Sequence, residues 1–377
     1  MKRRVWLLRG AQLGGVTTLL GLVGLLIMGS GIVPIKASSG HWRITAALLD
    51  FAKRRSVSTH TLAATTLPNL TDPALILRGA GHYEGGCRPC HGSPELHQPR
   101  IARAMTPLPP YLAPRISRWD ASELFYLVKH GIKFTGMPAW PAQQRDDEVH
   151  AVVAFLLEMP KLDVSRYQRL VHGEQRPKSS NIPLAELPET DKVPGAVERS
   201  CARCHGHDGQ GRGLGAFPKL AGQQANYLVG ALRAYTQDKR HSGIMQPVAA
   251  GLTEPEILRL ADYYASLAPS RPEADTDKAQ AERGACIADE GVPGVGVPAC
   301  KECHGPTRHA RNPAYPNLAG QYASYLELQL QLFKRQQRGG AAYAHLMQHV
   351  AGRLSEQQMR DVAAYYASLN PEDVNRE

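Results

Sequence analysis

The chain has 377 residues, of which 43% are hydrophobic, 6% aromatic and 21% charged, and its formal net charge is +10. This length is too great for one small core and allows two to four domains. Residues 1–60 hold nine lysines and arginines against one acidic residue, Asp50, so most of the positive charge lies near the N-terminus. Because this excess flanks an apolar segment, it indicates a membrane surface and argues against a nucleic-acid-binding protein.

The N-terminal segment predicts a membrane anchor. Residues 10–35 form a charge-free run of 26 residues, and a helix that spans a bilayer needs about 20. The apolar part of a signal peptide is about 7–15 residues long and precedes a small-residue cleavage site. The nearest such stretch, Ile35-Lys36-Ala37, has a bulky side chain where a small one is needed. We therefore expect a tail over residues 1–9 and an uncleaved transmembrane helix over residues 10–35.

Basic residues lie on both sides of this run in nearly equal number, so charge alone does not fix its orientation. Residues 36–71 follow as an interfacial or linker segment. Trp42 and the stretch ITAALLDFAKRR are typical of an element whose basic end meets lipid headgroups. An ordinary amphipathic helix that leads into a linker explains the same residues equally well.

The rest of the chain contains three similar units. After a motif of the form Cys-X-X-Cys-His, residues 218–223 (PKLAGQ) are echoed by residues 316–321 (PNLAGQ), and residues 261–267 (ADYYASL) by residues 363–369 (AAYYASL). A methionine precedes the aromatic residue of the last helix by 18 residues in each unit: Met137 before Phe155, Met245 before Tyr263, and Met347 before Tyr365. Such constant offsets indicate sister domains, of which the first is the most distant.

We expect an all-α fold, because little in these units alternates with a period of two, while apolar residues such as Val149, Val152, Val153, Leu156 and Leu157 recur at helical spacing. The expected boundaries are 72–162 for the first domain, 190–269 for the second and 274–371 for the third. A linker over residues 163–189 would join the first domain flexibly to the other two.

Six of the seven cysteines fall in three tight pairs, each followed at once by a histidine. Cysteines at positions i and i+3 present both sulfurs to one edge of a porphyrin, and the histidine at i+4 points at its iron, so the motif indicates covalently attached haem c. A zinc site would need four ligands, and a redox dithiol would lie near a βαβ pattern; neither arrangement is evident here. The residues expected to bind three haem c groups are Cys87, Cys90, Cys201, Cys204, Cys300 and Cys303, with His91, His205 and His304 as axial ligands.

A second axial ligand is expected before the last helix of each unit, where Met137, Met245 and Met347 recur. Met105 is a rival in the first unit, and His130, His345 and His349 are alternatives. A thioether ligand favours ferrous iron and raises the reduction potential. Iron with both axial positions filled has no vacancy for a substrate, so the predicted chemistry is one-electron transfer without catalysis.

Residues 190–371 resemble the periplasmic di-haem cytochromes of the c-four kind through PKLAGQQANYL, IMQPVA, PNLAGQYASYL and AAYYASL. Residues 72–160 resemble the single-haem class I domains of oxidase haem c subunits through CRPCHG and LFYLVKHGIKFTGMPAW. The resemblance implies three class I cytochrome c domains. It also implies that the carbonyls of Pro218 and Pro316 orient the ligand histidines. The first unit departs from this pattern, and its PLPP cluster at Pro107 is assigned no such contact.

Haem attachment in this family takes place outside the cytoplasmic membrane, which implies an N-terminus inside the cell and haem domains in the periplasm of a bacterium. The resemblance also implies a respiratory electron carrier, supplied by a quinol-oxidising complex or a dehydrogenase and oxidised by a terminal oxidase. A cytochrome subunit of a membrane-bound dehydrogenase is the alternative. A haem peroxidase or sensor would need an iron with a labile site. Cys286, the seventh cysteine, is expected to be a small core residue.

Overall fold

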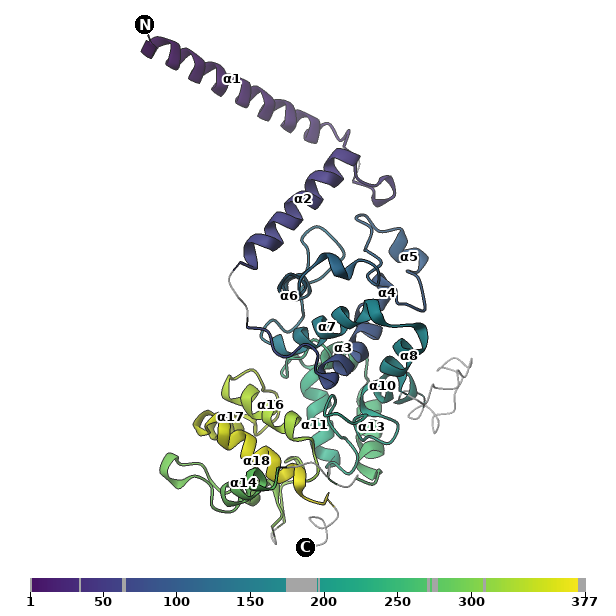
Figure 1. The fold of residues 1–377 in the computed structure, drawn as a ribbon, viewed down its shortest axis with the longest axis vertical. Coiled ribbons are helices and arrows are strands. Elements are labelled where there is room, and N and C mark those ends of the chain that lie inside the picture. The colour runs from purple at the N-terminus through teal and green to yellow at the C-terminus, as the bar shows by residue number, and fades with distance from the viewer. Residues whose placement is uncertain are drawn as a thin grey trace.

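The computed structural model describes residues 2–33, 35–62, 66–173, 197–269, 277–307 and 310–371, together with residues 195 and 272. Within these ranges the regular elements are helices, apart from one isolated β-bridge between Val292 and Val297. The all-α prediction is therefore confirmed. Figure 1 shows the order of the helices, with the N-terminal pair at one end of the molecule.

The two N-terminal helices are α1 (Lys2–Gly29) and α2 (Arg43–His60), with a short 3₁₀ turn, η1 (Ala37–Ser39), between them. Helix α1 stands apart from the other helices in Figure 1, and side chains such as Leu20, Leu26 and Met28 are exposed. Helix α2 contacts α6, and its Lys53 and Arg54 lie over the ring of Trp119. Among the described residues, no helix combines the length and apolar character needed to cross a membrane.

The first unit begins where Asp72 caps a helix by accepting a hydrogen bond from the Ala74 N–H, with Pro73 at the first helical position. Its buried core runs along α7, where Val149, Val152, Val153 and Leu156 are buried, as their spacing predicts. Its helices are α3 (Pro73–Gly86), α4 (Arg88–His91), α5 (Arg100–Arg103), η2 (Ile116–Arg118), α6 (Ala121–His130), α7 (Asp146–Glu158) and η3 (Met159–Lys161).

The chain continues as a helix, α8 (Val164–His172), where the sequence suggested the start of a linker. Tyr167 and Val171 are four residues apart, so they share one face of α8, and both are buried where α8 packs against α3. Residues 174–194, which include the greater part of the linker predicted over residues 163–189, lie outside the described ranges.

The second and third units repeat the same plan, and a capping box begins the last helix of each, with Thr253 and Glu256 in one and Ser355 and Gln358 in the other. The second unit contains η5 (Val197–Cys201), α10 (Ala202–His205), α11 (Ala225–Thr236), α12 (Met245–Ala249) and α13 (Glu254–Ser266). The third contains α14 (Lys278–Glu290), η6 (Pro293–Val295), α15 (Lys301–His304), α16 (Ala323–Lys334), α17 (Ala344–Arg353) and α18 (Glu356–Ser368).

Close helix crossings join the beginning and the end of the first and third units. A Cβ atom at Gly79 of α3 would lie 2.0 Å from the carbonyl oxygen of Ala151 on α7. A Cβ atom at Gly284 of α14 would lie 2.0 Å from the carbonyl oxygen of Asp361 on α18. Only glycine allows backbones to approach so closely, so these two residues fix the crossings against which each motif is placed.

Candidate functional site

Each cysteine pair and its histidine lie on a single helical turn. In the first unit, the N–H groups of Cys90 and His91 donate to the carbonyl of Cys87 at 3.1 and 2.9 Å. In the third, the His304 N–H donates to the carbonyl of Cys300 at 3.0 Å. A glycine with φ between 71° and 78° ends all three turns, so the chain leaves directly after the histidine. The residues at i, i+3 and i+4 therefore share one side of a short helix, as the motif predicts.

The three histidine rings are oriented in the same way. The Nδ1–H groups donate to proline carbonyls: His91 to Pro110 at 2.9 Å, His205 to Pro218 at 3.0 Å and His304 to Pro316 at 3.1 Å. With Nδ1 engaged, Nε2 is the nitrogen left to bind a metal, and the hydrogen bond fixes the ring orientation.

The contacts of Pro218 and Pro316 confirm what the resemblance implies. Pro110 is the residue that the sequence reasoning missed. It lies 19 residues after His91, against 13 and 12 residues in the other units, because the loop of the first unit is longer. Pro110 is the last proline of the PLPP cluster, so this cluster was the feature of the sequence that could have predicted the contact with His91.

Burial lowers the pKa of His91, His205 and His304, and it outweighs the opposing effect of the proline carbonyls. A lowered pKa keeps each imidazole neutral at physiological pH, which is the form that binds a metal. The three imidazoles are therefore suited both in direction and in protonation to act as iron ligands.

Partial burial raises the pKa and so favours the protonated form of Cys87, Cys201, Cys204, Cys300 and Cys303. Burial raises the pKa of Cys87 to about 12 and the pKa values of Cys201 and Cys300 to about 11. A reactive dithiol needs the opposite shift, because the thiolate is the nucleophile. Paired cysteines beside an imidazole with a directed Nε2 fit the attachment of haem through two thioethers, and this donor set recurs in each unit.

The three predicted methionines lie before the last helix of each unit, in different local settings. Met137 is in a loop, where its N–H donates to the hydroxyl of Thr135 at 3.1 Å. Met245 is the first residue of α12, and Met347 lies within α17, where it packs half-buried against the core. Helix formation by these segments was not expected from their loop-like sequences. The rival side chains His130, His345 and His349 are exposed.

Met105 lies in the same neighbourhood as Met137. A Cβ atom at Gly136 would be 2.1 Å from the terminal methyl carbon of Met105, so this side chain packs directly on the residue before Met137. The fold therefore places the Met105 side chain beside the segment that holds Met137.

We expect Met137→Leu to abolish the near-infrared sulfur-to-iron absorption of the first haem and to lower its reduction potential, because the thioether ligand is lost. Met105→Leu is the matched control, since it removes the neighbouring sulfur at similar volume and should cost less than about 1.5 kcal/mol of stability. Near-infrared spectra and redox titrations of the two variants measure the effect. Loss of the band in Met105→Leu alone would reverse the assignment.

His82 adds a pH-dependent element beside the first motif. Its ring lies 4.7 Å from that of Trp140, and burial, with a smaller effect of Arg203, lowers its pKa from 6.5 to about 4. Because the unfolded chain binds this proton at higher pH, the contribution of His82 is complete above pH 6.5 and is lost as the pH falls towards 4.

We expect acidification from pH 7 to pH 4 to cost the wild-type protein about 3 kcal/mol more stability than the His82→Gln variant. Denaturant titrations of both proteins at several pH values provide this difference, in which the contributions of other titrating groups cancel. Parallel pH profiles would show that His82 carries no such penalty.

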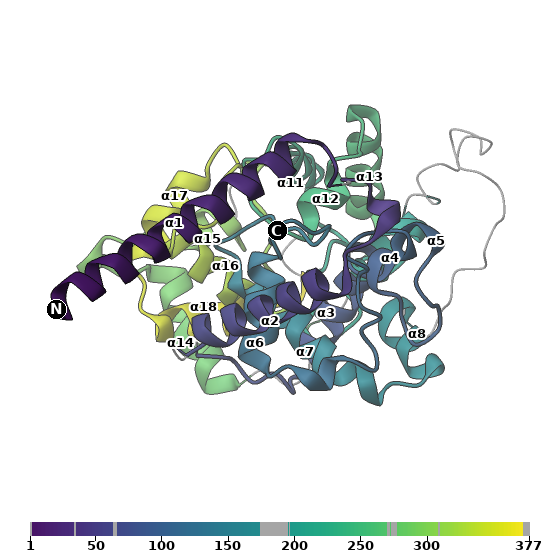
Figure 2. The same cartoon turned by 90° about the horizontal axis from the view of Figure 1, so that it is seen from above.

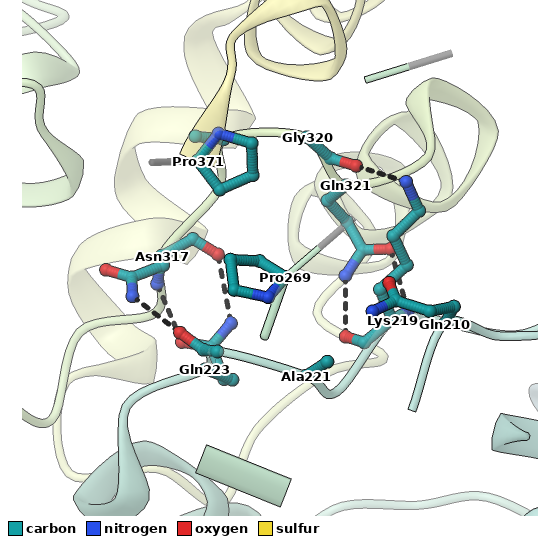
Figure 3. Close-up of a pocket in the computed structure, with 11 residues that line it drawn as sticks. Gln210, Lys219, Ala221, Gln223, Pro269, Asn317, Gly320, Gln321 and Pro371 are labelled. Carbon is teal, nitrogen blue, oxygen red and sulfur yellow. Dashed lines mark hydrogen bonds between the residues drawn. The ribbon is translucent and has the colours of Figure 1, made fainter. Parts of the chain in front are cut away.

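The second and third units face each other through reciprocal hydrogen bonds, drawn in Figure 3. The side chain of Gln321 accepts from the N–H of Lys219 and donates to its carbonyl, both at 3.0 Å. The side chain of Gln223 does the same with Asn317, at 2.7 and 2.9 Å. These residues occupy equivalent places in the repeated PXLAGQ segments, so the repeat itself builds a pseudo-symmetric interface.

Comparisons with known families divide the chain in the same way. Residues 74–156 match the family described as cytochrome c oxidase, cbb3-type, subunit III. Residues 194–268 and 281–370 each match the family described as cytochrome c.

Three relatives illustrate the similarity of the second and third units to characterised proteins. A cytochrome c-552 from Acidithiobacillus ferridurans is 36% identical over 47% of this chain and 76% of its own length. A thiosulfate dehydrogenase electron acceptor from Thiomonas intermedia is 35% identical over 45% of this chain and 78% of its own. A cytochrome c4 from Thiocapsa roseopersicina is 37% identical over 45% of this chain and 87% of its own.

Proposed function

We propose a respiratory role for this chain. It belongs to the c-type cytochromes of the cytochrome c4 kind. It also carries an additional domain that is similar to subunit III of cbb3-type oxidases. It is a multi-haem electron carrier and not an enzyme. In the proposal it is a membrane-tethered, tri-haem cytochrome that passes single electrons towards a terminal oxidase. The observation that carries it is the threefold repeat of a cysteine pair whose histidine is oriented by a proline carbonyl.

The proposal assigns one covalently bound haem c to each unit. Bound haem supplies an iron that cycles between two oxidation states by one electron. The chain would hold each haem through its cysteine pair and would direct the histidine by the proline carbonyl. The buried imidazoles of His205 and His304 would also exclude water from the iron. In this assignment Met137, Met245 and Met347 complete the axial positions.

The proposed tether is the charge-free run of residues 10–35. This assignment is supported by the exposure of large apolar side chains along α1, among them Leu19, Leu22 and Leu25. Because water solvates such side chains poorly, an exposed apolar surface of this kind indicates a contact with a membrane. Trp42, which precedes helix α2, and Ile44 and Phe51 within it are also exposed, as expected for an element that lies along a membrane surface. The proposed topology has the N-terminus inside and the haem domains in the periplasm.

A second role, as the electron-accepting subunit of a dehydrogenase, has specific support. The relative from Thiomonas intermedia is named for accepting electrons from thiosulfate dehydrogenase. The two roles share the same chemistry and differ in the partner that supplies the electrons.

The proposal is tested on protein purified from membranes of the native host. We expect all three haems to remain attached on a denaturing gel, and the reduced protein to be reoxidised by a terminal oxidase. A variant that lacks residues 1–35 should leave the membrane fraction when expressed with a cleavable export signal in their place. Haem that is lost on denaturation would contradict covalent attachment, and co-purification with a dehydrogenase would favour the second role.

A further inference from the structure

The first unit is docked onto the second by buried contacts. Along α3, Leu77 forms a buried cluster with Ala216 and Phe217 of the second unit. The guanidinium Nε of Arg78 donates to the carbonyl of Ala216 at 3.0 Å. A covalent linker alone, as expected from the sequence, would leave these surfaces in water, so the flexible attachment predicted for the first unit is corrected.

This contact reaches the thiol that is proposed to carry the second haem. A Cβ atom at Gly81 of α3 would lie 2.9 Å from the Phe217 ring and 3.1 Å from the Sγ atom of Cys204. Cys87, proposed to carry the first haem, follows the end of the same helix six residues later. At 1.5 Å per residue these positions are about 9 Å apart along the helix axis. One helix therefore borders the attachment points of both sites.

A second contact joins the methionine segments of the two units. Glu148 of α7 is 2% exposed. Its Oε2 atom accepts from the Trp140 ring N–H at 3.0 Å and from the Gly243 N–H at 2.7 Å. Its Oε1 atom accepts from the Ser242 hydroxyl at 2.6 Å and lies 3.1 Å from Arg145 Nη2. We call these five residues the Glu148 clamp.

The clamp is attached to both proposed methionine ligands through short stretches of backbone. Trp140 follows Met137 by three residues, and Ser242 precedes Met245 by three. The Ser242 hydroxyl also accepts from the Met245 N–H at 3.0 Å. Arg145 adds a hydrogen bond from Nη1 to the His241 carbonyl at 3.0 Å. A buried carboxylate with all its partners in place holds such a network in one arrangement.

The second site is thus bounded on both sides within the chain. The first unit contacts its cysteine side at Gly81 and its methionine side through the Glu148 clamp, and the third unit meets it through the PXLAGQ segments. Figure 1 shows α3 of the first unit close to α10 of the second, which it contacts, and Figure 2 shows the same helices from above.

We propose that the second haem site is the relay of the chain, so that electrons pass between the first and third sites through it, and that Glu148 is a positioning residue for this step. The inference rests on the proposed function. Electron transfer between haems slows steeply as the distance between them increases. A substitution that separates the first unit from the second should therefore slow transfer between their haems without altering any iron ligand.

The test uses the haem-loaded protein with a ruthenium photosensitiser on a single engineered cysteine. Ile101→Cys places the label on α5, which contacts the first motif, at a position that is 80% exposed, and Cys286→Ser removes the competing exposed thiol. A laser flash reduces the first site, and absorbance then follows the electron onward. Difference spectra from redox titration of the same protein distinguish the three haems.

Two variants open the clamp from opposite sides. Gly243→Ala adds a Cβ atom that would lie 2.4 Å from the Trp140 ring, and Glu148→Ala removes every hydrogen bond of the carboxylate. We expect both to slow transfer from the first to the second site about tenfold or more, with the sulfur-to-iron band retained. Glu148→Gln keeps one acceptor oxygen that can serve both Trp140 and Gly243, so it should restore the rate to within about threefold of wild type.

Gly251→Ala is the matched control for Gly243→Ala, because nothing lies within 4 Å of its added Cβ atom. An unchanged first transfer step in both Gly243→Ala and Glu148→Ala would overturn the relay, as would direct transfer from the first to the third site. If one variant fails to fold, the other decides the question. Absence of covalent haem or of photoreduction in the labelled parent protein would instead contradict the proposed function.

Discussion

Replacement of Cys300 and Cys303 together by alanine is expected to remove one haem of three and to unfold the third unit. The buried cores of this unit are small: one contains Ala288, Leu326, Val362, Ala363, Tyr365 and Tyr366, and the other surrounds Phe333 and Met359. A domain of this size with a thin core depends on its cofactor, and Cys300 itself packs against the first of these clusters. Loss of the attachment points therefore removes part of the core as well as the redox centre.

The measurement is the haem content per polypeptide, combined with limited proteolysis across residues 281–370. We expect two haems, rapid cleavage of the third unit, and an intact first and second unit. Cys286→Ala is the control, because Cys286 is exposed on α14 and lies outside the motif. This exposure also corrects the expectation that Cys286 is a core residue. Three haems in the double variant would show that the cysteines of this motif do not hold one.

Gly284→Ala should destabilise the third unit by about 3 kcal/mol or more, because overpacking against a backbone atom cannot be relieved by turning a side chain. The added Cβ atom would lie 2.0 Å from the Asp361 carbonyl oxygen, 2.5 Å from the Asp361 carbonyl carbon and 2.8 Å from the Tyr365 Cβ atom. None of these atoms is the end of a flexible side chain that could move aside. Helices α14 and α18 would have to separate, and the side chain of Tyr366, which is now buried, would become more exposed.

The comparison is with Gly352→Ala on α17 of the same unit, where nothing lies within 4 Å of the added Cβ atom. Alanine in a helix is favoured over glycine, so this control should be neutral or stabilising by up to about 0.8 kcal/mol. For a domain of this size, a loss of 3 kcal/mol lowers Tm by more than about 10 °C. Calorimetry that found the two variants equally stable would contradict the crossing described here.

The chemistry of the motifs could be predicted from sequence because it is local. Two thiols and an imidazole at positions i, i+3 and i+4 meet on one helical turn wherever that turn forms, and the repeats at residues 201–205 and 300–304 support the same interpretation. Of the five apolar positions that helical periodicity predicted for helix α7, four are buried and Leu157 is half-buried. The sequence did not predict helix α8, because Tyr167 and Val171 are buried by packing against α3. This contact is not evident from the sequence of the segment alone.

Contacts between distant segments required the tertiary structure. The carbonyl that orients His91 lies 19 positions further along the chain, and Glu148 meets Ser242 across 94 positions of sequence. The local sequence does not distinguish Glu148 from Asp146 and Asp147, because all three are acidic residues in the first turn of the helix. The sequence by itself determined which residues can hold haem, because attachment and ligation are properties of one turn of helix. Only the fold decided which sites lie side by side, because docking depends on surfaces that are complementary in three dimensions.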